Sequence, residues 1–167
     1  MKRIGVLSDT HGTVPQQIYS FFKDCDELWH AGDVGRGVLE ELRQFKPLRA
    51  VYGNIDSGDV RIKFPEVYRW KCEEVDVLMK HIGGYPGKYD ASIRKIIYAR
   101  PPQLFISGHS HLLKVVHDPT IQCLHINPGA AGRYGFHEVR TLVRFTIDGK
   151  DIKDLEVIEL NDERSGV

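Results

Sequence analysis

The sequence has few cysteines and no long hydrophobic run. Its three cysteines, Cys25, Cys72 and Cys123, are odd in number and widely spaced, which argues against a disulfide framework and against a cysteine metal site. We therefore expect core or half-buried thiols in a reducing compartment, the cytoplasm. No apolar run approaches the roughly 20 residues that span a bilayer. Residues 1–7 lack the features of a secretory signal, so neither a span nor a signal is expected.

A net charge is also absent, because 23 Lys and Arg side chains balance 23 Asp and Glu side chains. Without a basic surplus, the chain is not expected to follow a nucleic-acid backbone or to bind an anionic membrane. Its 167 residues suffice for one domain with a sizeable core and are too few for two. We expect a single domain over residues 1–160 and a polar tail over residues 161–167, and we leave a homo-oligomer open.

The first half of the chain alternates short apolar runs with segments of helical periodicity. This alternation predicts crossover units and a largely parallel sheet. In the first helical segment, Thr13 is the expected N-cap and Pro15 falls in the first turn. The expected strands are residues 4–7, 28–30 and 48–52, and the expected helices are residues 14–22 and 38–45.

The second half is richer in strands. Two strand-like runs, 67–71 and 75–80, precede a loop rich in glycine and proline, and a helix with apolar residues from Tyr89 to Ile97 ends before Pro101. Further strand-like runs follow, of which the last two are joined by a turn pair: 104–106, 113–117, 121–126, 140–147 and 152–160. Strands on both sides of a helix in so short a chain predict an α/β fold with two sheets packed face to face and helices outside.

Seven nitrogen and oxygen donors stand at the ends of these strand-like runs. Asp9 and His11 follow the first run two residues apart, and His109 and His111 repeat that spacing, so each pair can point the same way. The other donors end further runs: Asp33, Asn54 and His81. One ion does not need seven donors, so the set predicts a dinuclear centre that performs hydrolysis.

The kinds of donor also favour a catalytic centre, because carboxylate and imidazole together are typical of first-row metal ions. Asp33 has two carboxylate oxygens and is predicted to bridge two cations. The carbonyl oxygen of Asn54 can bind a cation, or its amide can face the substrate. Glycines beside the donors, such as Gly12 and Gly108, suit tight loops.

The order and spelling of these motifs resemble the calcineurin-like metallophosphoesterases, from Ile4 to about Phe145. The likeness is strongest for the small bacterial and archaeal phosphodiesterase branch, which also includes the retromer scaffold subunit. It is carried by five motifs and by a loop at residues 127–129: Ser8-Asp9-Thr10-His11-Gly12, His30-Ala31-Gly32-Asp33-Val34, Gly53-Asn54-Ile55-Asp56, His81 and Gly108-His109-Ser110-His111.

The resemblance implies a four-layer α/β/β/α sandwich of two mixed β-sheets with flanking helices and a two-metal site at one edge. It also implies two ligand sets that share Asp33: Asp9, His11 and His111 for one ion, and Asn54, His81 and His109 for the other. Mn²⁺ is the expected metal, with Fe, Zn²⁺, Ni²⁺ or Co²⁺ as alternatives, because the ligand types do not select among them.

The implied function is hydrolysis of a small phosphorylated substrate, most simply a phosphodiester. Two cations lower the pKa of a bridging water from about 15.7 toward roughly 7, so that metal-bound hydroxide attacks phosphorus in line. The metals and Asn54 stabilise the charge that grows in the transition state. Many larger relatives have a histidine after the asparagine to protonate the leaving group, but Ile55 cannot do so. Water, Asp56 or another histidine is left for that step, and alkyl phosphates are expected to react slowly.

Two other uses of the same fold stay open. The alternative to the enzyme is a protein-interaction scaffold, although such scaffolds can lose metal histidines and this chain keeps all seven donors. A nuclease is a weaker hypothesis, because the basic surplus is missing. Outside the donor set, His30 either orients Asp33 or is a core histidine. The remaining histidines lack partners at ligand spacing and are expected to be surface or structural residues: His117, His125 and His137.

Overall fold

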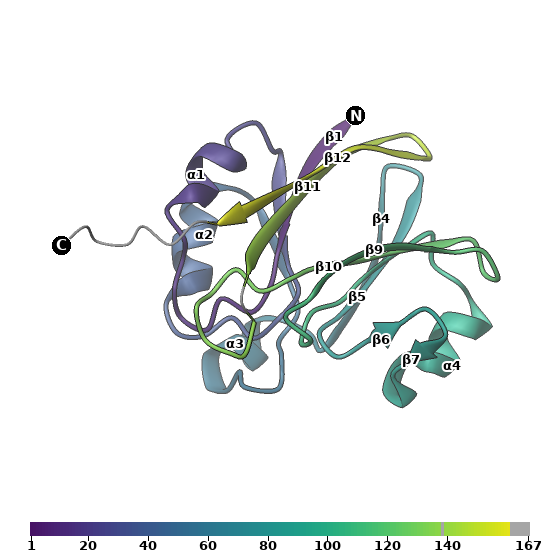
Figure 1. Cartoon of the computed structure of the whole chain (residues 1–167), viewed down its shortest axis with the longest axis horizontal. Coiled ribbons are helices and arrows are strands. Elements are labelled where there is room, and N and C mark those ends of the chain that lie inside the picture. Colours follow the sequence, from purple (N-terminus) through teal and green to yellow (C-terminus); the bar gives the residue numbers. More distant parts are fainter. Residues whose placement is uncertain (138, 161–167) are drawn as a thin grey trace.

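A computed structural model describes residues 1–137 and 139–160 of the protein. The expected polar tail, residues 161–167, lies outside the described residues. Two five-stranded mixed sheets pack face to face, with helices on their outer faces (Figure 1). The expected α/β/β/α sandwich is therefore confirmed. No helix in the described part of the chain is both long enough and apolar enough to cross a membrane.

The first sheet has the strand order β12-β11-β1-β2-β3. Its parallel part consists of β1 (Lys2–Leu7), β2 (Glu27–His30) and β3 (Leu48–Ala50). The hairpin of β11 (Arg140–Asp148) and β12 (Asp151–Leu160) continues the sheet antiparallel to β1. Because parallel strands end at the same edge of a sheet, the loops after β1, β2 and β3 start side by side.

The second sheet has the order β4-β5-β8-β10-β9. Its three central strands run parallel: β5 (Val75–Lys80), β8 (Leu104–Ile106) and β10 (Cys123–Pro128). The edge strands β4 (Val67–Cys72) and β9 (Leu113–Asp118) are antiparallel to their neighbours. The strand expected at 121–126 begins two residues later than predicted, because the turn after β9 extends through Gln122, which has a φ of +52°.

The first helix differs from the prediction, because part of the predicted segment belongs to the loop after β1. The first helix, α1 (Gln17–Phe21), is shorter than the predicted 14–22, and its N-cap is Gln16, so the prediction of Thr13 as N-cap was wrong. The backbone N–H of Thr13 donates instead to the carbonyl of Thr10, 3.1 Å away, inside the loop after β1. The helix α2 (Val38–Phe45) has the predicted bounds.

Three further short elements complete the described chain. The helix α3 (Gly58–Lys63) was not predicted, because it has no buried residue and therefore no apolar periodicity. The hairpin of β6 (Gly84–Tyr85) and β7 (Lys88–Tyr89) occupies the loop rich in glycine and proline. The helix α4 (Ala91–Ala99) follows, with Asp90 as its N-cap.

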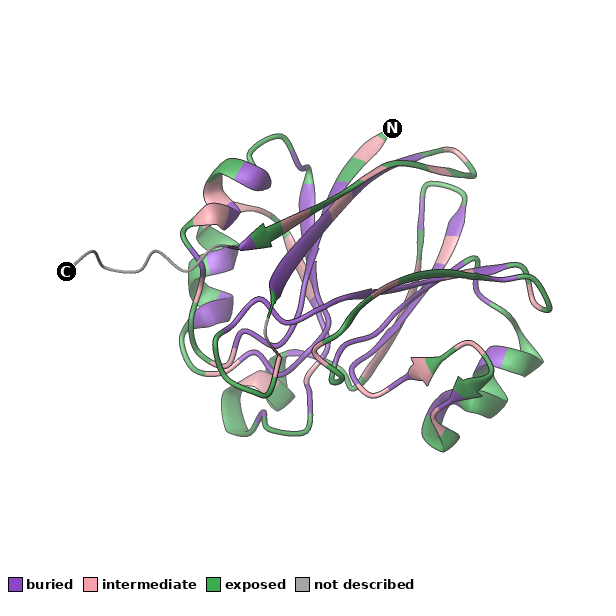
Figure 2. Cartoon of the chain, in the orientation of Figure 1, coloured by how far each residue is buried: buried purple, intermediate pink, exposed green. Residues whose placement is uncertain are grey.

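The core follows from the alternation of side chains along each strand. Val6 and Trp29 from the first sheet meet Met79 and Ile106 from the second in the apolar cluster between the sheets. Leu78, next to Met79, points the other way, into the cluster beneath α4. Buried segments accordingly follow the strands, while the helices are exposed on their outer sides (Figure 2). The two sheets are thus held face to face, and their strand ends stay in fixed positions.

Each outer layer is held by its own apolar cluster. Ile18 of α1 and Leu42 of α2 pack with Leu28 against the first sheet. Ile93 and Ile97 of α4 pack against the second sheet. Their neighbour on the same helix, Ile96, is instead exposed.

This contrast gives a test of the outer layer. We expect Ile97→Ala to lower the free energy of unfolding by about 2 to 5 kcal/mol, because it leaves a cavity beneath α4. Ile96→Ala makes the same chemical change on the same helix and is expected to stay within about 0.5 kcal/mol of the wild type. Urea unfolding followed by circular dichroism measures both. Equal losses in the two variants would contradict the packing of α4.

A buried histidine, His125 of β10, lies outside the strand ends that carry the seven donors. Its ring stacks on Phe105 at 5.3 Å, and its Nε2 is 2.8 Å from the Ser107 hydroxyl. Burial, with a smaller effect of the charge on Lys114, lowers the pKa of His125 from its ordinary 6.5 to about 4. His125 was expected to be a surface or structural residue, and it is a buried structural one.

The depressed pKa of His125 predicts a loss of stability in acid. Between pH 6.5 and 4 the unfolded chain binds a proton at His125 that the folded chain does not, so the free energy of unfolding falls as the pH falls. The loss from this group approaches about 3 kcal/mol across that window. We expect His125→Gln to show a shallower decline than the wild type in urea unfolding between pH 7.5 and 4.5. Parallel declines would assign the acid sensitivity to other groups.

Candidate metal centre

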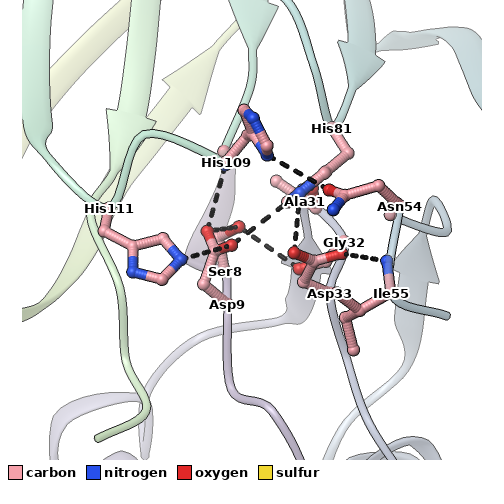
Figure 3. Close-up of polar contacts among 12 residues, drawn as sticks. Ser8, Asp9, Ala31, Gly32, Asp33, Asn54, Ile55, His81, His109 and His111 are labelled. Carbon is pink, nitrogen blue, oxygen red and sulfur yellow. Dashed lines mark hydrogen bonds and ion pairs between the residues drawn. The ribbon is translucent and has the colours of Figure 1, made fainter. Parts of the chain in front are cut away.

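Loops from both sheets meet at one edge of the sandwich and carry all seven predicted donors. Asp9 and Asp33 face each other there, with His111 on one side and His81, His109 and Asn54 on the other (Figure 3). Backbone hydrogen bonds hold the first two loops together: Asp9 N donates to Gly32 O at 3.0 Å, and His11 N donates to Asp33 O at 3.1 Å. The convergence results from the shared direction of the parallel strands.

The donors form two groups. In each group the candidate ligand atoms lie within 4.8 Å of one another: Asp9, His11 and His111 in the first, and Asp33, His81 and His109 in the second. Asn54 joins the second group, because its Oδ1 is 3.1 Å from Nδ1 of His109. The structure therefore brings together every donor that the sequence analysis selected.

Asp33 lies between the two groups. Its Oδ2 is 3.1 Å from Nε2 of His81 in its own group and 3.8 Å from Nε2 of His11 in the other. Its Oδ1 accepts a hydrogen bond from the backbone N–H of Ile55 at 3.0 Å. A side chain at Gly53 would place its Cβ 2.1 Å from that same oxygen, so a glycine is required there. One carboxylate oxygen is thus anchored and the other faces both groups.

Asp9 is fully buried, and its two carboxylate oxygens also have different surroundings. Its Oδ2 accepts from the Ser8 hydroxyl at 2.6 Å and from the backbone N–H of His109 at 3.2 Å. Its Oδ1 makes no hydrogen bond of good geometry among the described residues, although Nε2 of His111 lies 3.2 Å away. The same is true of Nε2 of His11 and of Nε2 of His81, which lies 3.1 Å from Oδ2 of Asp33. Buried polar atoms without partners are costly, and these three belong to one cluster. A cation that accepts their lone pairs removes the cost, so the donor set fits a metal ion.

The backbone at these donors is strained. Positive φ angles occur at five of the seven donors: Asp9 (54°), His11 (47°), Asp33 (54°), His109 (71°) and His111 (63°). A side chain in this left-handed region costs roughly 1 to 3 kcal/mol and persists only where the surroundings impose it. The strain is concentrated where the side chains must converge, as expected for a functional site.

Electrostatics keep both carboxylates ionised. Burial by itself raises the pKa of Asp9, but the contacts with His111, His81 and Ser8 outweigh it and leave that pKa below its ordinary value. For Asp33, burial is likewise outweighed, chiefly by His81, so its pKa is also lowered. The pKa of His81 is raised, because its contacts with Asp33 and Asp9 exceed the opposing effect of burial. The pKa of His111 is raised as well, chiefly by its contact with Asp9. Both carboxylates therefore stay ionised at neutral pH, and ionised carboxylates suit a cation.

The imidazoles are oriented from behind. Nδ1 of His81 lies 2.7 Å from the carbonyl oxygen of Ala31 and donates to it, which turns Nε2 toward the two carboxylates. The ring of His109 contacts that of His81 edge to face, at 5.3 Å. Such hydrogen bonds to the nitrogen opposite the ligand atom select the tautomer that can bind a metal.

His30 belongs to the loops rather than to the donor set. It is fully buried, its Nδ1 accepts from Gly32 N at 3.1 Å, and its Nε2 lies 3.0 Å from the hydroxyl of Thr10. Since that hydroxyl donates to Val34 O at 2.6 Å, it accepts from His30, which is therefore neutral. Burial lowers the pKa of His30 to about 4, in agreement with this tautomer. Of the two readings left open, His30 is a core histidine that joins the loops after β1 and β2.

Asp56 is tied up by the backbone. It is 4% exposed, and its two oxygens accept from the backbone N–H groups of Val34, Gly35 and Gly53 at 2.9 to 3.1 Å. These bonds join the loop that carries Asp33 to the loop that carries Asn54. The arrangement argues against the predicted part for Asp56 in protonating a leaving group and favours a part in holding the two loops.

Comparison with known proteins agrees with the resemblance that the sequence motifs carry. Residues 1–150 match the model of the calcineurin-like phosphoesterase superfamily domain. A search of curated proteins finds no match.

Among solved structures, an archaeal phosphodiesterase is 22% identical with a TM-score of 0.75, covering 95% of this chain and 99% of its own. Vps29 from Entamoeba histolytica, solved with zinc, is 17% identical with a TM-score of 0.71, covering 95% of this chain and 99% of its own. A Thermotoga maritima protein is 25% identical with a TM-score of 0.70, covering 96% of this chain and 100% of its own.

The position of Asp56 generates a prediction about stability without metal. We expect Asp56→Ala to lower the free energy of unfolding by about 2 to 4 kcal/mol, because buried N–H groups lose their acceptor. Urea unfolding in the presence of a chelator measures this. Asp59→Ala, on the first turn of α3 and exposed, is the control and is expected to be near neutral. A wild-type unfolding curve for Asp56→Ala would show that the carboxylate does not hold the loops.

Proposed function

This chain belongs to the calcineurin-like phosphoesterase superfamily, and we propose that it is a dinuclear metal-dependent phosphodiesterase acting on a small substrate. The observation that carries the proposal is the cluster of two ionised carboxylates and four imidazoles, three of whose buried atoms make no hydrogen bond in the described chain. Members of this superfamily bind divalent metal ions, and the cluster fits them.

The proposed ligand sets follow the two groups of donors. One ion is assigned to Asp9, His11 and His111, and the other to Asn54, His81 and His109, with Asp33 shared. We propose Mn²⁺ as the metal, with Fe, Zn²⁺, Ni²⁺ and Co²⁺ as alternatives of similar ligand preference. When bound, two such ions supply Lewis acidity that polarises the phosphoryl oxygens and makes hydroxide available at neutral pH.

The chain's own residues then position the substrate. Asn54 is exposed beside His109, so its amide N–H can donate to a phosphoryl oxygen while its Oδ1 faces the centre. A donor in place before the reaction stabilises the negative charge that develops on the phosphoryl oxygens, at no cost of reorganisation. Asp33 keeps its free oxygen between the groups through the hydrogen bond from Ile55. Asn54 and Asp33 are therefore the residues proposed to act directly.

A cavity of about 240 Å³ adjoins the centre on the side of Asn54 and His81. Two cationic side chains, Arg61 and Lys80, and one carboxylate, Glu66, also line it. The ammonium group of Lys80 is mostly buried, donates to Ile82 O at 3.1 Å and is 3.8 Å from Glu66. The excess of positive groups beside the donors suits an anionic phosphoester and supports a small-molecule substrate.

The leaving group receives less help from the chain. Ile55 is 47% exposed at the position after Asn54 and has no proton to transfer, while Asp56 is engaged with the backbone. We therefore propose that solvent protonates the leaving group and that activated diesters, whose leaving groups need no proton, react fastest. A cytoplasmic location is proposed with this function, in keeping with three buried free thiols.

The second candidate function is a protein-interaction scaffold on the same fold. The likeness to Vps29 favours it. The complete donor set favours the enzyme, because a scaffold does not need a cluster of buried polar atoms that make no hydrogen bond.

Hydrolysis of an aryl phosphodiester with added Mn²⁺ tests the proposal. We expect Asp33→Ala and His109→Ala each to reduce the rate at least about a hundredfold, because loss of a ligand should cost no less than loss of a group that orients one. His117→Ala, an exposed histidine on β9, is the matched control and is expected to retain wild-type activity. Undiminished hydrolysis in both ligand variants would overturn the proposed site.

Metal analysis of the purified protein separates the two candidates. An enzyme is expected to retain close to two equivalents of a transition metal after gel filtration in Mn²⁺. A protein that binds none, hydrolyses no phosphoester and forms a stable complex with another protein would support the scaffold.

A further inference from the structure

The connection between β10 and β11 lies against one half of the metal centre. Within it, Nδ1 of His137 is 2.9 Å from Nδ1 of His111, and the two rings meet edge to face at 4.8 Å. On its other side, Nε2 of His137 is 2.7 Å from the carbonyl oxygen of Gly132. His137 thus stands between a backbone carbonyl and a proposed ligand.

The positions of the protons follow from these contacts. A carbonyl oxygen can only accept, so Nε2 of His137 carries a hydrogen and donates it to Gly132. In the neutral ring, Nδ1 of His137 is then an acceptor, and the hydrogen in the bond to His111 belongs to Nδ1 of His111. His111 is left with Nε2 for a ligand, and that atom faces Oδ1 of Asp9 at 3.2 Å.

The close approach is built into the backbone. At Gly135, which has a φ of +130°, a Cβ atom would lie 2.4 Å from Nδ1 of His111 and 3.0 Å from Nδ1 of His137. At Gly132 a Cβ atom would lie 2.4 Å from Thr10 O, in the loop that carries Asp9 and His11. Glycines at both positions allow the connection to approach the centre this closely. A loop that only links two strands would not need such a close approach.

His81 shows the same construction in simpler form. The far nitrogen of His81 is held directly by the carbonyl of Ala31. The far nitrogen of His111 is held by His137, which is itself held by the carbonyl of Gly132.

We propose that His137 is a positioning residue of the metal centre, which holds His111 in the tautomer and orientation that leave Nε2 free for the ion. This inference rests on the proposed function only in taking His111 as a ligand. His137 does not touch the substrate or the ion; it acts through His111. The sequence offered no sign of it, since His137 is 26 residues from His111 and outside every motif.

Hydrogen-bond couplings in metal-free, ¹⁵N-labelled wild-type protein test the contact itself. We expect a coupling across the N–H···N bond between the Nδ1 atoms of His111 and His137, with His137 protonated at Nε2. A hydrogen on Nδ1 of His137, or no coupling at all, would overturn the proposal. This measurement needs neither a variant nor a metal.

Titration with Mn²⁺ tests the consequence. Removal of the acceptor in His137→Leu is expected to weaken Mn²⁺ binding about tenfold to a hundredfold. His137→Asn, whose amide oxygen can occupy the position of Nδ1, is expected to restore most of the affinity. His117→Leu, the same change at an exposed histidine outside the centre, is the control and should bind as the wild type does.

The outcomes separate this inference from the proposed function. Unchanged affinity in His137→Leu would overturn the inference even if the wild type hydrolyses diesters. Conversely, a wild type that hydrolyses nothing but binds Mn²⁺ with an affinity that falls in His137→Leu would leave the inference standing and reject the enzyme. If His137→Leu fails to fold, shown by its circular dichroism, the wild-type coupling and the affinity of His137→Asn decide.

Discussion

Asp9 and Asp33 carry negative charge at an edge of the sandwich from which water is largely excluded. Removing an ionised carboxylate from water costs several kcal/mol unless charge and hydrogen bonds compensate. Both carboxylates lie within 4 Å of the same atom, Nε2 of His81, at 3.8 and 3.1 Å. Each also uses one oxygen to accept hydrogen bonds from the chain, which leaves the other facing inward. The remainder of the centre is arranged around these two inward oxygens.

The strained backbone lies at the residues whose side chains surround this negative charge. The loops adopt left-handed conformations at Asp9, His11 and Asp33, the residues whose side chains converge on the centre. Backbone hydrogen bonds between the loops, together with Asp56 and His30 behind them, hold these conformations. A ligand that binds the folded state alone adds to its stability. A cation at the centre is thus expected to offset part of the strain and desolvation.

In the proposed enzyme, the metal side of the centre carries many more polar groups than the substrate side. Many groups converge on the inward oxygens, where cations and a nucleophile belong. On the proposed substrate side there is an exposed amide, Asn54, and an exposed apolar residue, Ile55. The adjoining cavity is lined by two cationic side chains, Arg61 and Lys80. The centre is well equipped to activate water and to bind an anion, and poorly equipped to donate a proton. Activated phosphodiesters suit that division better than alkyl esters do.

Much of this construction could be predicted from the sequence. Apolar alternation located the main strands, and donors at strand ends located the edge, because side-chain periodicity and strand direction are local properties. The short helix α3 has no buried side chain and left no pattern.

Only the tertiary structure decided the parts that depend on distant residues. Asp56 follows Asn54 and looked chemically available, yet its oxygens are occupied by backbone groups about 20 positions earlier. His137 was predicted to be a surface or structural residue, yet it contacts His111, because a glycine-containing connection returns from the end of β10 to the centre. The sequence alone determined which donors reach the edge of the sandwich. The fold decided how each is oriented, because orientation depends on hydrogen bonds between segments that only the packed sheets bring together.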